Sequence, residues 1–168
     1  MPEAYQWTSA LEGRRVAVVS SFAETACGQA TRAAAVWSGR AVLPKATYLP
    51  VETRYSPRLA QGRAEWPNTV TSWDSAVTHV VNRVMELDAD IVLIGCGGLG
   101  MVIGHELRMR GKVCIVMGGA IQVLFGIKGR RWQNHSIIST FWNDAWVWPR
   151  FEDTPAGADE VESSCYWS

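Results

Sequence analysis

The sequence lacks an excess of either charge. Lys and Arg together number 16, and Asp and Glu together also number 16, so the formal net charge is zero. Proteins that bind DNA or RNA over a broad surface usually carry a basic excess, so the balance argues against a broad nucleic-acid surface. The sequence also lacks a signal peptide and any apolar run of ~18 residues. We therefore expect no membrane segment and a cytoplasmic location.

Metal-binding and nucleophile motifs are also missing. The four cysteines form no C-x-x-C pair and no zinc spacing, and no two of the three histidines lie at ligand spacing. We therefore predict no metal ligands in this chain. The P-loop pattern and G-x-S-x-G are absent too, which excludes two common designs of phosphate and acyl-transfer site.

The composition is that of one ordinary globular domain. With 168 residues, 48% of them hydrophobic, the chain is long enough to bury a core without disulfides or metals. Nine Trp residues are unusually many, and they fit a binding cleft, a homo-oligomer interface or plain core packing equally well. We treat 1–168 as a single domain, with 1–13 as a lead-in and 149–168 as a tail docked on the domain by its closing aromatics.

Apolar periodicity predicts alternating strands and helices. Unbroken apolar strands separated by helices are typical of a parallel sheet that is covered on both faces. The predicted fold class is therefore α/β, a Rossmann-like three-layer sandwich with a mostly parallel sheet. The expected strands are 14–21, 46–51, 90–95 and 112–117, and the expected helices are 25–37, 72–87, 99–110 and one beginning near Gly119.

A glycine-rich turn follows the strand in DIVLIGCGGLG. Gly95, Gly97 and Gly100 have the G-x-G-x-x-G spacing, and Gly98 lies within the same turn. Such a turn lets backbone N–H groups approach a phosphate, and the helix after it adds a partial positive charge. A tight strand-to-helix turn without a ligand remains an alternative.

The next strand decides against NAD as the favoured ligand. A dinucleotide site needs an Asp or Glu at the end of that strand, but VCIVMGG closes on a second glycine turn at Gly118 and Gly119. Lys128, Arg130 and Arg131 follow this turn, and cations beside two backbone-donor turns suit a diphosphate. A solvated basic loop would explain them as well. We expect no NAD.

One carboxylate is placed to act as a base. Glu24 follows the first strand and should therefore emerge at the same sheet edge as the glycine turns, where it could accept a proton from a sugar hydroxyl. An acidic residue at a helix start is the other explanation. The D-x-D of Asp88-Ala-Asp90 lies at the opposite end of its strand, so we interpret it as a connection and not as a metal site.

The order of these segments resembles a known family. From Trp7 to Trp167, and above all in GGAIQVLFGIKGRRW and CYW, the chain is similar to the carboxyl-terminal part of glycosyltransferase-like proteins of polysaccharide biosynthesis clusters, which are related to the GT-D fold. The resemblance implies a nucleotide-sugar donor and a carbohydrate or other hydroxyl acceptor. Matched by position, it implies a donor site built from the turn Gly95–Gly100 and the block Gly118–Trp132, surrounded by further residues. The site residues expected from these two lines of argument, besides the glycines and Glu24, are Gln122, Lys128, Arg130, Arg131, Trp132, Asn143, Trp146, Glu162 and Tyr166.

The chain also departs from that family. Fuller members carry an amino-terminal region with a motif similar to the D-x-E that holds a divalent cation, Mn²⁺ or Mg²⁺, and no D-x-E occurs here. Three explanations stay open: a partner subunit supplies the missing part, the enzyme is metal-independent, or the chain is a binding remnant. The leading hypothesis is a glycosyltransferase. The alternatives are a non-catalytic nucleotide-sugar or carbohydrate-binding subunit and, third, an NAD-dependent enzyme.

Overall fold

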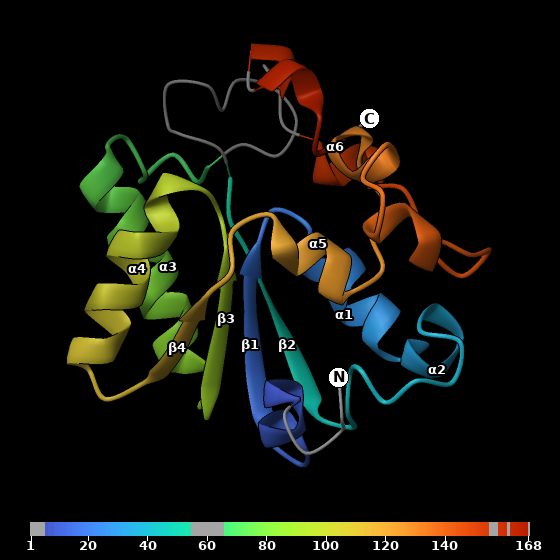
Figure 1. Ribbon diagram of the computed structural model, residues 1–168. Coiled ribbons are helices and arrows are strands. Elements are labelled where there is room, and N and C mark those ends of the chain that lie inside the picture. The colour runs from blue at the N-terminus through green and yellow to red at the C-terminus, as the bar shows by residue number, and fades with distance from the viewer. Residues whose placement is uncertain (1–5, 55–65, 155–157, 161, 168) are drawn as a thin grey trace.

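A parallel sheet of four strands forms the centre of the protein in the computed structural model, which describes residues 6–54, 66–154, 158–160 and 162–167. The strands are β1 (Arg15–Ser20), β2 (Thr47–Glu52), β3 (Ile91–Gly95) and β4 (Val113–Val116). Their order in the sheet is β2-β1-β3-β4 (Figure 1). The chain therefore leaves β1 toward one side to form β2, and then returns to the other side of β1 to form β3 and β4.

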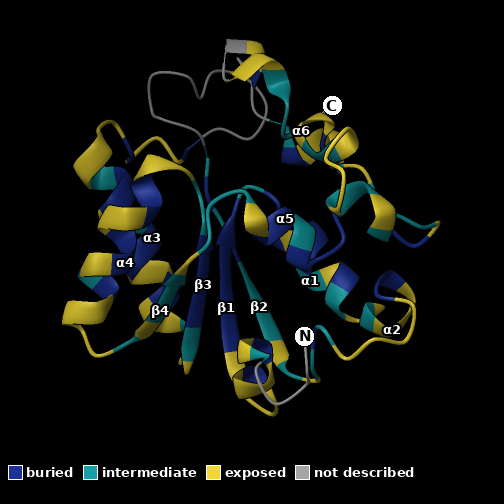
Figure 2. Ribbon diagram, viewed as in Figure 1, coloured by how far each residue is buried: buried dark blue, intermediate teal, exposed yellow. Residues whose placement is uncertain are grey.

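The two central strands are buried on both faces, as their unbroken apolar sequences require (Figure 2). Because side chains alternate along a strand, β1 and β3 supply two separate cores. One face contributes Val16, Val18 and Leu93, and the other contributes Ala17, Val19, Val92 and Ile94. The predicted three-layer α/β sandwich is confirmed.

Helices cover both of these faces. The long helices α3 (Trp73–Glu86) and α4 (Gly98–Met109) pack on the core that contains Ala17. The shorter helices α1 (Ala23–Ala30), α2 (Ala33–Val36) and α5 (Ala120–Leu124) pack on the core that contains Val16 (Figure 1). The remaining helical segments are α6 (Arg130–Gln133) and the 3-10 turns Trp7–Leu11, Ile138–Phe141, Phe151–Asp153, Ala158–Glu160 and Glu162–Ser164.

The predicted single helix over residues 25–37 is wrong, because the structure has two short helices there. The break falls at Thr31, whose hydroxyl donates to the Gly28 carbonyl at 2.7 Å. Such a side-chain bond competes with the helical ladder. Gln29 contributes as well, since its side-chain amide donates to the backbone carbonyl of Ala145 at 2.8 Å. The end of α1 therefore makes a tertiary contact, between Gln29 and Ala145, that the sequence of the helix does not reveal.

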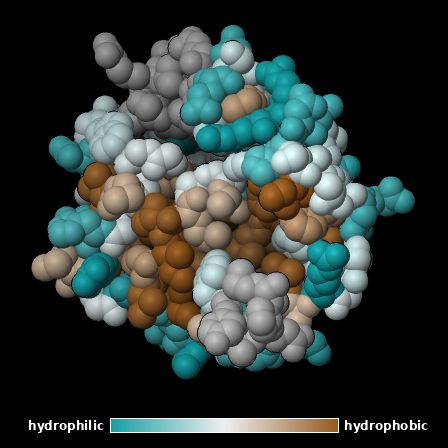
Figure 3. Space-filling model, viewed as in Figure 1, coloured by the Kyte–Doolittle hydropathy of each residue, from teal (hydrophilic) through white to brown (hydrophobic). Residues whose placement is uncertain are grey.

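The strand β4 forms one edge of the sheet and leaves apolar side chains exposed. Val113 and Val116 on this strand are exposed, as are Met101 and Met109 on α4. Apolar side chains gather on the corresponding face of the molecule (Figure 3). None of the helices in the described part of the chain is long and apolar enough to cross a membrane.

Candidate functional site

The strand order creates a divergence at the carboxyl edge of the sheet. The loop after β1 leads toward β2, whereas the loop after β3 leads toward β4 on the other side, so the two loops separate from each other. Ser20 and Gly95, which end these two strands, are paired in register. In open α/β sheets, ligands bind in the crevice that opens at such a switch point.

A cavity of about 270 Å³ lies at this point, and we call it the switch-point cavity. All four strands contribute to it through the residues that follow them. Its walls comprise Ser21 and Phe22 after β1, Thr53 and Arg54 after β2, Gly95 to Leu99 after β3, Gly118, Gly119, Ile121 and Gln122 after β4, and Trp73, Tyr166 and Trp167 from other segments.

The helix α4 begins at the cavity wall without a side-chain cap. Its N-cap residue is Gly97, with φ 60° and ψ −141°, a conformation that is essentially restricted to glycine. No side chain accepts from the first turn, and the Gly100 N–H turns back to the Gly97 carbonyl at 3.0 Å. The N–H groups of Gly98 and Leu99, which a helix cannot satisfy by itself, thus lie where an anion would be stabilised.

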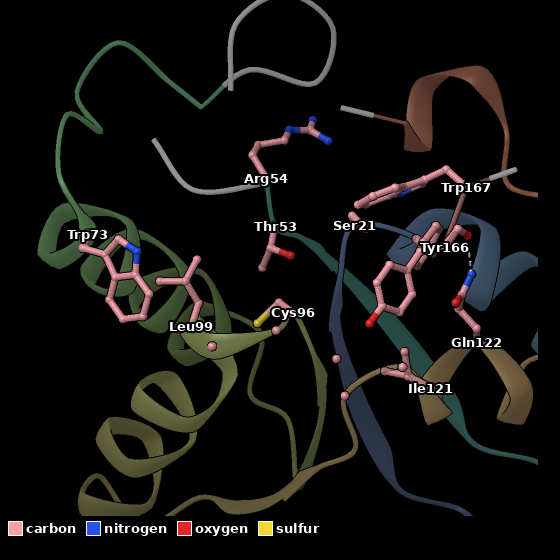
Figure 4. Close-up of a pocket in the computed structure, with 16 residues that line it drawn as sticks. Ser21, Thr53, Arg54, Trp73, Cys96, Leu99, Ile121, Gln122, Tyr166 and Trp167 are labelled. Atoms are coloured by element: carbon pink, nitrogen blue, oxygen red, sulfur yellow. Dashed lines mark hydrogen bonds between the residues drawn. The ribbon is translucent and has the colours of Figure 1, made fainter. Parts of the chain in front are cut away.

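Aromatic rings flank the cavity on two sides. Trp73, the first residue of α3, lies on one side, and Tyr166 and Trp167 lie on the other, with Cys96 between them (Figure 4). The exposed fraction of Trp73 is 45%, so part of its surface remains free to contact a ligand. Aromatic faces of this kind stack on planar bases and on the apolar faces of sugars.

Two side chains of the cavity wall have raised pKa values and stay protonated at neutral pH. Burial raises the pKa of the Cys96 thiol to about 12, so this thiol is an apolar part of the wall and not a ready nucleophile. Burial also raises the pKa of the Tyr166 hydroxyl, although the neighbouring Arg131 opposes the shift. The Tyr166 hydroxyl accepts a hydrogen bond from the Arg131 guanidinium.

Most of the predicted glycines are at the cavity. Gly95, Gly97, Gly98, Gly118 and Gly119 line it. Gly100 does not, because it is buried in the first turn of α4. A Cβ at Gly100 would lie 3.1 Å from Ile94 and 3.5 Å from Val116, so this glycine permits the close packing of α4 on the sheet.

Gln122 and Tyr166 meet at the cavity although they are distant in sequence. The buried side-chain amide of Gln122 donates to the Tyr166 carbonyl at 2.7 Å (Figure 4). Its Oε1 atom is also buried and has no hydrogen-bond partner among the described residues. Gln122 therefore attaches the closing aromatic segment to the helix α5.

The three predicted cations lie outside the cavity wall. Arg130 donates to the Ser163 carbonyl, and Arg131 contacts Glu162 at 3.4 Å as well as the Tyr166 hydroxyl. The Lys128 ammonium lies 5.7 Å from the ring centre of Trp142. In this structure, then, the two arginines hold the carboxyl-terminal segment in place, and neither they nor Lys128 reach the cavity.

Asn143, Trp146 and Trp132 also lie outside the cavity wall. Asn143 donates to the carbonyls of Ala35 and Val36 at 3.2 and 3.1 Å, and the Trp146 indole N–H donates to the same Val36 carbonyl at 2.9 Å. Both side chains therefore anchor the end of α2. Trp132 lies behind Gly119, where an added Cβ would approach its ring to 3.5 Å.

Glu24 occupies a neighbouring cavity and not the switch-point cavity. It is exposed in the first turn of α1 and lines a second hollow of about 280 Å³ with Glu52, Arg54, His79 and Arg83 among others. The prediction that Glu24 emerges at the same sheet edge agrees with this placement. Arg54 lines both cavities, so the two hollows adjoin each other.

Sequence reasoning missed several wall residues. Thr53 and Arg54 directly follow β2, and Ser21 follows β1, so the rule that ligands bind at strand carboxyl ends could have identified them. Trp73 and Trp167 carry no such signal, because only the folded chain brings them to this edge. Arg54 therefore supplies the cation at the cavity that the sequence predicts in the segment after Gly119.

The described residues do not fit a divalent-cation site. Among the residues that the structure describes, the wall of the switch-point cavity contains no carboxylate and no imidazole. Within the described ranges, no three His, Cys, Asp or Glu side chains are grouped so that they could hold a metal ion. Hard cations such as Mg²⁺ need oxygen ligands, above all carboxylates.

Comparison with protein-family models, curated proteins and solved structures finds no match to this chain.

Proposed function

We propose that the protein binds a nucleoside-diphosphate sugar in the switch-point cavity and transfers the sugar to a hydroxyl acceptor. The observation that carries the proposal is the uncapped start of α4, which opens into this cavity at the switch point of the sheet. The resemblance to glycosyltransferase-like proteins supports the same function.

A diphosphate suits the floor of the cavity. The N–H groups of Gly98 and Leu99 and the positive end of the twelve-residue helix α4 favour an anion. Arg54 supplies a full positive charge at the rim, although its Nη2 atom also pairs with Glu52 at 2.7 Å. During transfer, these donors would stabilise the negative charge that develops on the leaving diphosphate.

The aromatic walls suit the rest of the donor. Trp73 offers a partly exposed ring, and Phe22, Tyr166 and Trp167 provide an apolar surface on the opposite side. A nucleobase or sugar ring can stack on such surfaces while the diphosphate lies between them at the glycine turn.

A dinucleotide fits the site less well. The wall after β4 consists of Gly118, Gly119, Ile121 and Gln122, so no carboxylate is present there to accept from ribose hydroxyls. NAD therefore remains the third candidate, and the structure adds no ligand group in its favour.

A non-catalytic binding subunit is the second candidate. The described part of the switch-point cavity wall supplies no carboxylate to act as a base, and this favours binding without transfer. The two candidates differ in one measurement. A transferase releases nucleoside diphosphate from its donor when an acceptor is present, whereas a binding subunit holds the donor intact.

The placement of the diphosphate is tested at Gly98. This residue has room for a side chain, because an added Cβ would only touch the Trp73 ring at 3.8 Å. We expect Gly98→Asp to weaken nucleotide-sugar binding at least tenfold, about 1.4 kcal/mol, because the carboxylate would repel the diphosphate. Gly98→Ala is the matched control and should stay within about threefold of the parent protein in affinity.

Binding is measured by calorimetry and thermal shift with UDP-, GDP- and dTDP-sugars and with NAD(H), each with and without Mn²⁺. Undiminished nucleotide-sugar binding by Gly98→Asp would show that the diphosphate lies elsewhere. Stabilisation by NAD(H) alone would reverse the order of the candidates.

A further inference from the structure

The second cavity is polar, in contrast to the switch-point cavity. It lies between the start of α1, the end of β2 and the side of α3. Its charged and aromatic lining comprises Glu24, Glu52, Arg54, Trp66, His79 and Arg83. Its volume, about 280 Å³, is similar to that of its neighbour, and each alone is near the lower end of known ligand pockets.

The two cavities share a wall. Arg54 lines both of them, and the chain passes from Phe22 in the first cavity to Glu24 in the second within one turn of helix. A molecule in the second cavity therefore lies beside a molecule in the first, at the same edge of the sheet. Two adjoining sites can hold the two substrates of a transfer reaction side by side.

The charges of the second cavity balance. Among the described lining residues, the two carboxylates of Glu24 and Glu52 equal the two guanidinium groups in number, so these residues favour neither an anionic nor a cationic ligand. Glu52 already pairs with Arg54 at 2.7 Å, and Arg83 pairs with Glu86 at 2.8 Å. Hydroxyl groups suit such a lining, because they donate to carboxylates and accept from guanidinium groups.

Glu24 is the carboxylate that remains available. Its side chain forms no hydrogen bond and no ion pair with another residue in the described ranges, although its charge acts on the neighbouring Cys27 thiol. Its oxygens can therefore accept from a ligand hydroxyl without first breaking a protein contact. The Trp66–His79 pair, with ring centres 6.2 Å apart, belongs to another part of the cavity lining.

We propose that the second cavity binds a neutral, hydroxyl-rich acceptor such as an uncharged sugar, with Glu24 as its general base. The proposal rests on the proposed donor site. In the transfer, the acceptor hydroxyl gives its proton to Glu24 and its oxygen bonds to the anomeric carbon of the donor. The bond from that carbon to the diphosphate oxygen breaks, and its electron pair leaves with the diphosphate.

Two variants at one position test the acceptor site. Glu24→Gln keeps the shape but removes the charge, and Glu24→Trp fills the hollow. Because Glu24 is exposed, both should fold like the parent protein. Glu106→Gln is the matched control, since Glu106 pairs with Arg110 on α4 and lines neither cavity. Methyl glycosides of neutral hexoses and of hexuronic acids are the probes, and saturation-transfer NMR in the presence of UDP-sugar measures their binding.

We expect neutral hexosides to bind the parent protein and Glu106→Gln in preference to hexuronosides, and to lose binding to Glu24→Trp. Glu24→Gln should bind the UDP-sugar within twofold of the parent protein but lower the release of UDP in the presence of hexoside at least a hundredfold.

Two results would overturn this assignment. The first is that the parent protein binds no hexoside, and the second is that both Glu24 variants bind hexosides as tightly as the parent protein does. Failure of the donor site looks different, because no nucleotide sugar would then bind to any variant, whatever the hexosides do.

Discussion

At Gly126 the backbone passes so close to Val36 that no Cβ can be added without overlap. The residue also has a φ of +67°, in the left-handed region that favours glycine. Its carbonyl accepts a hydrogen bond from the buried Gln29 side chain at 3.2 Å. A single glycine thus joins α1 and α2 to the segment after α5.

We expect Gly126→Ala to lower the free energy of unfolding by about 2–4 kcal/mol, through overpacking against Val36 and the unfavourable φ. Urea denaturation measures the change. Gly28→Ala is the control, because Gly28 is exposed in α1 and a Cβ there would meet nothing within 4 Å. This control should gain about 0.5–1 kcal/mol, and equal effects of the two substitutions would contradict the argument.

The sequence alone does not show which glycines bind a ligand and which permit close packing. The spacing of Gly95, Gly97 and Gly100 predicted one ligand-binding turn, yet the structure divides its members between the cavity wall and the packing of α4. Each glycine has the same lack of a side chain, and only its neighbours in space show what that lack permits.

At the scale of elements, the helix α3 begins with a well-formed capping box. Ser72 accepts from the Ser75 N–H at 3.2 Å, and the Ser75 hydroxyl accepts from the Ser72 N–H at 2.9 Å. The cap places Trp73, the first helical residue, at the rim of the switch-point cavity. The start of this helix thus positions a wall of the candidate site.

We expect Ser72→Ala to lower the free energy of unfolding by about 1 kcal/mol, because the Ser75 N–H loses its acceptor, while Ser72→Asp retains most of the stability. Thermal and urea denaturation measure both. Thr78→Ala, at an exposed position within α3, should change the stability by less than about 0.5 kcal/mol. A Ser72→Ala protein as stable as the parent would show that the cap is not needed.

Elements with strong periodicity were predicted well. The expected helices 72–87 and 99–110 correspond to α3 and α4, and each expected strand corresponds to an observed one. Apolar periodicity depends on neighbours in the chain, so it can be recognised without the tertiary structure. The interruption between α1 and α2 was missed because the alanine-rich sequence favours one continuous helix. At the break the Thr31 hydroxyl donates to the Gly28 carbonyl, and the neighbouring Gln29 reaches Ala145 and Gly126.

At the scale of the whole molecule, the closing aromatic segment completes both the core and the candidate site. Trp167 is buried, belongs to the same core as Val16, and lies with its ring centre 6.1 Å from that of Phe22. It also lines the switch-point cavity. Stability and ligand binding therefore depend on the same contact between distant parts of the chain.

We expect Trp167→Ala to lower the free energy of unfolding by about 3–5 kcal/mol and to weaken nucleotide-sugar binding. Trp148→Ala is the control, because Trp148 is exposed and lines neither cavity. The control should lose about 1 kcal/mol from its ring contact with Trp142 and leave binding unchanged. Calorimetry and urea denaturation distinguish the two, and a stable, fully binding Trp167→Ala protein would contradict the dual role.

The association state and the cellular location stay predictions.

The amino-acid sequence was sufficient to establish the α/β class, the parallel strands and the glycine turn after β3. These features arise from neighbours in the chain, through strand alternation, helical periodicity and the conformational freedom of glycine. The cavity itself could not be read in this way. Parallel strands end at one edge whatever their separation in sequence, and this is why Arg54, which follows β2, lines the same cavity as Gly98. Trp73 and Trp167 reach this cavity only through the packing of α3 and of the carboxyl-terminal segment. Conversely, nearness in sequence to a glycine turn does not place a side chain in the cavity beside that turn. Arg130 and Arg131 follow Gly119 closely in sequence, yet their side chains contact the carboxyl-terminal segment.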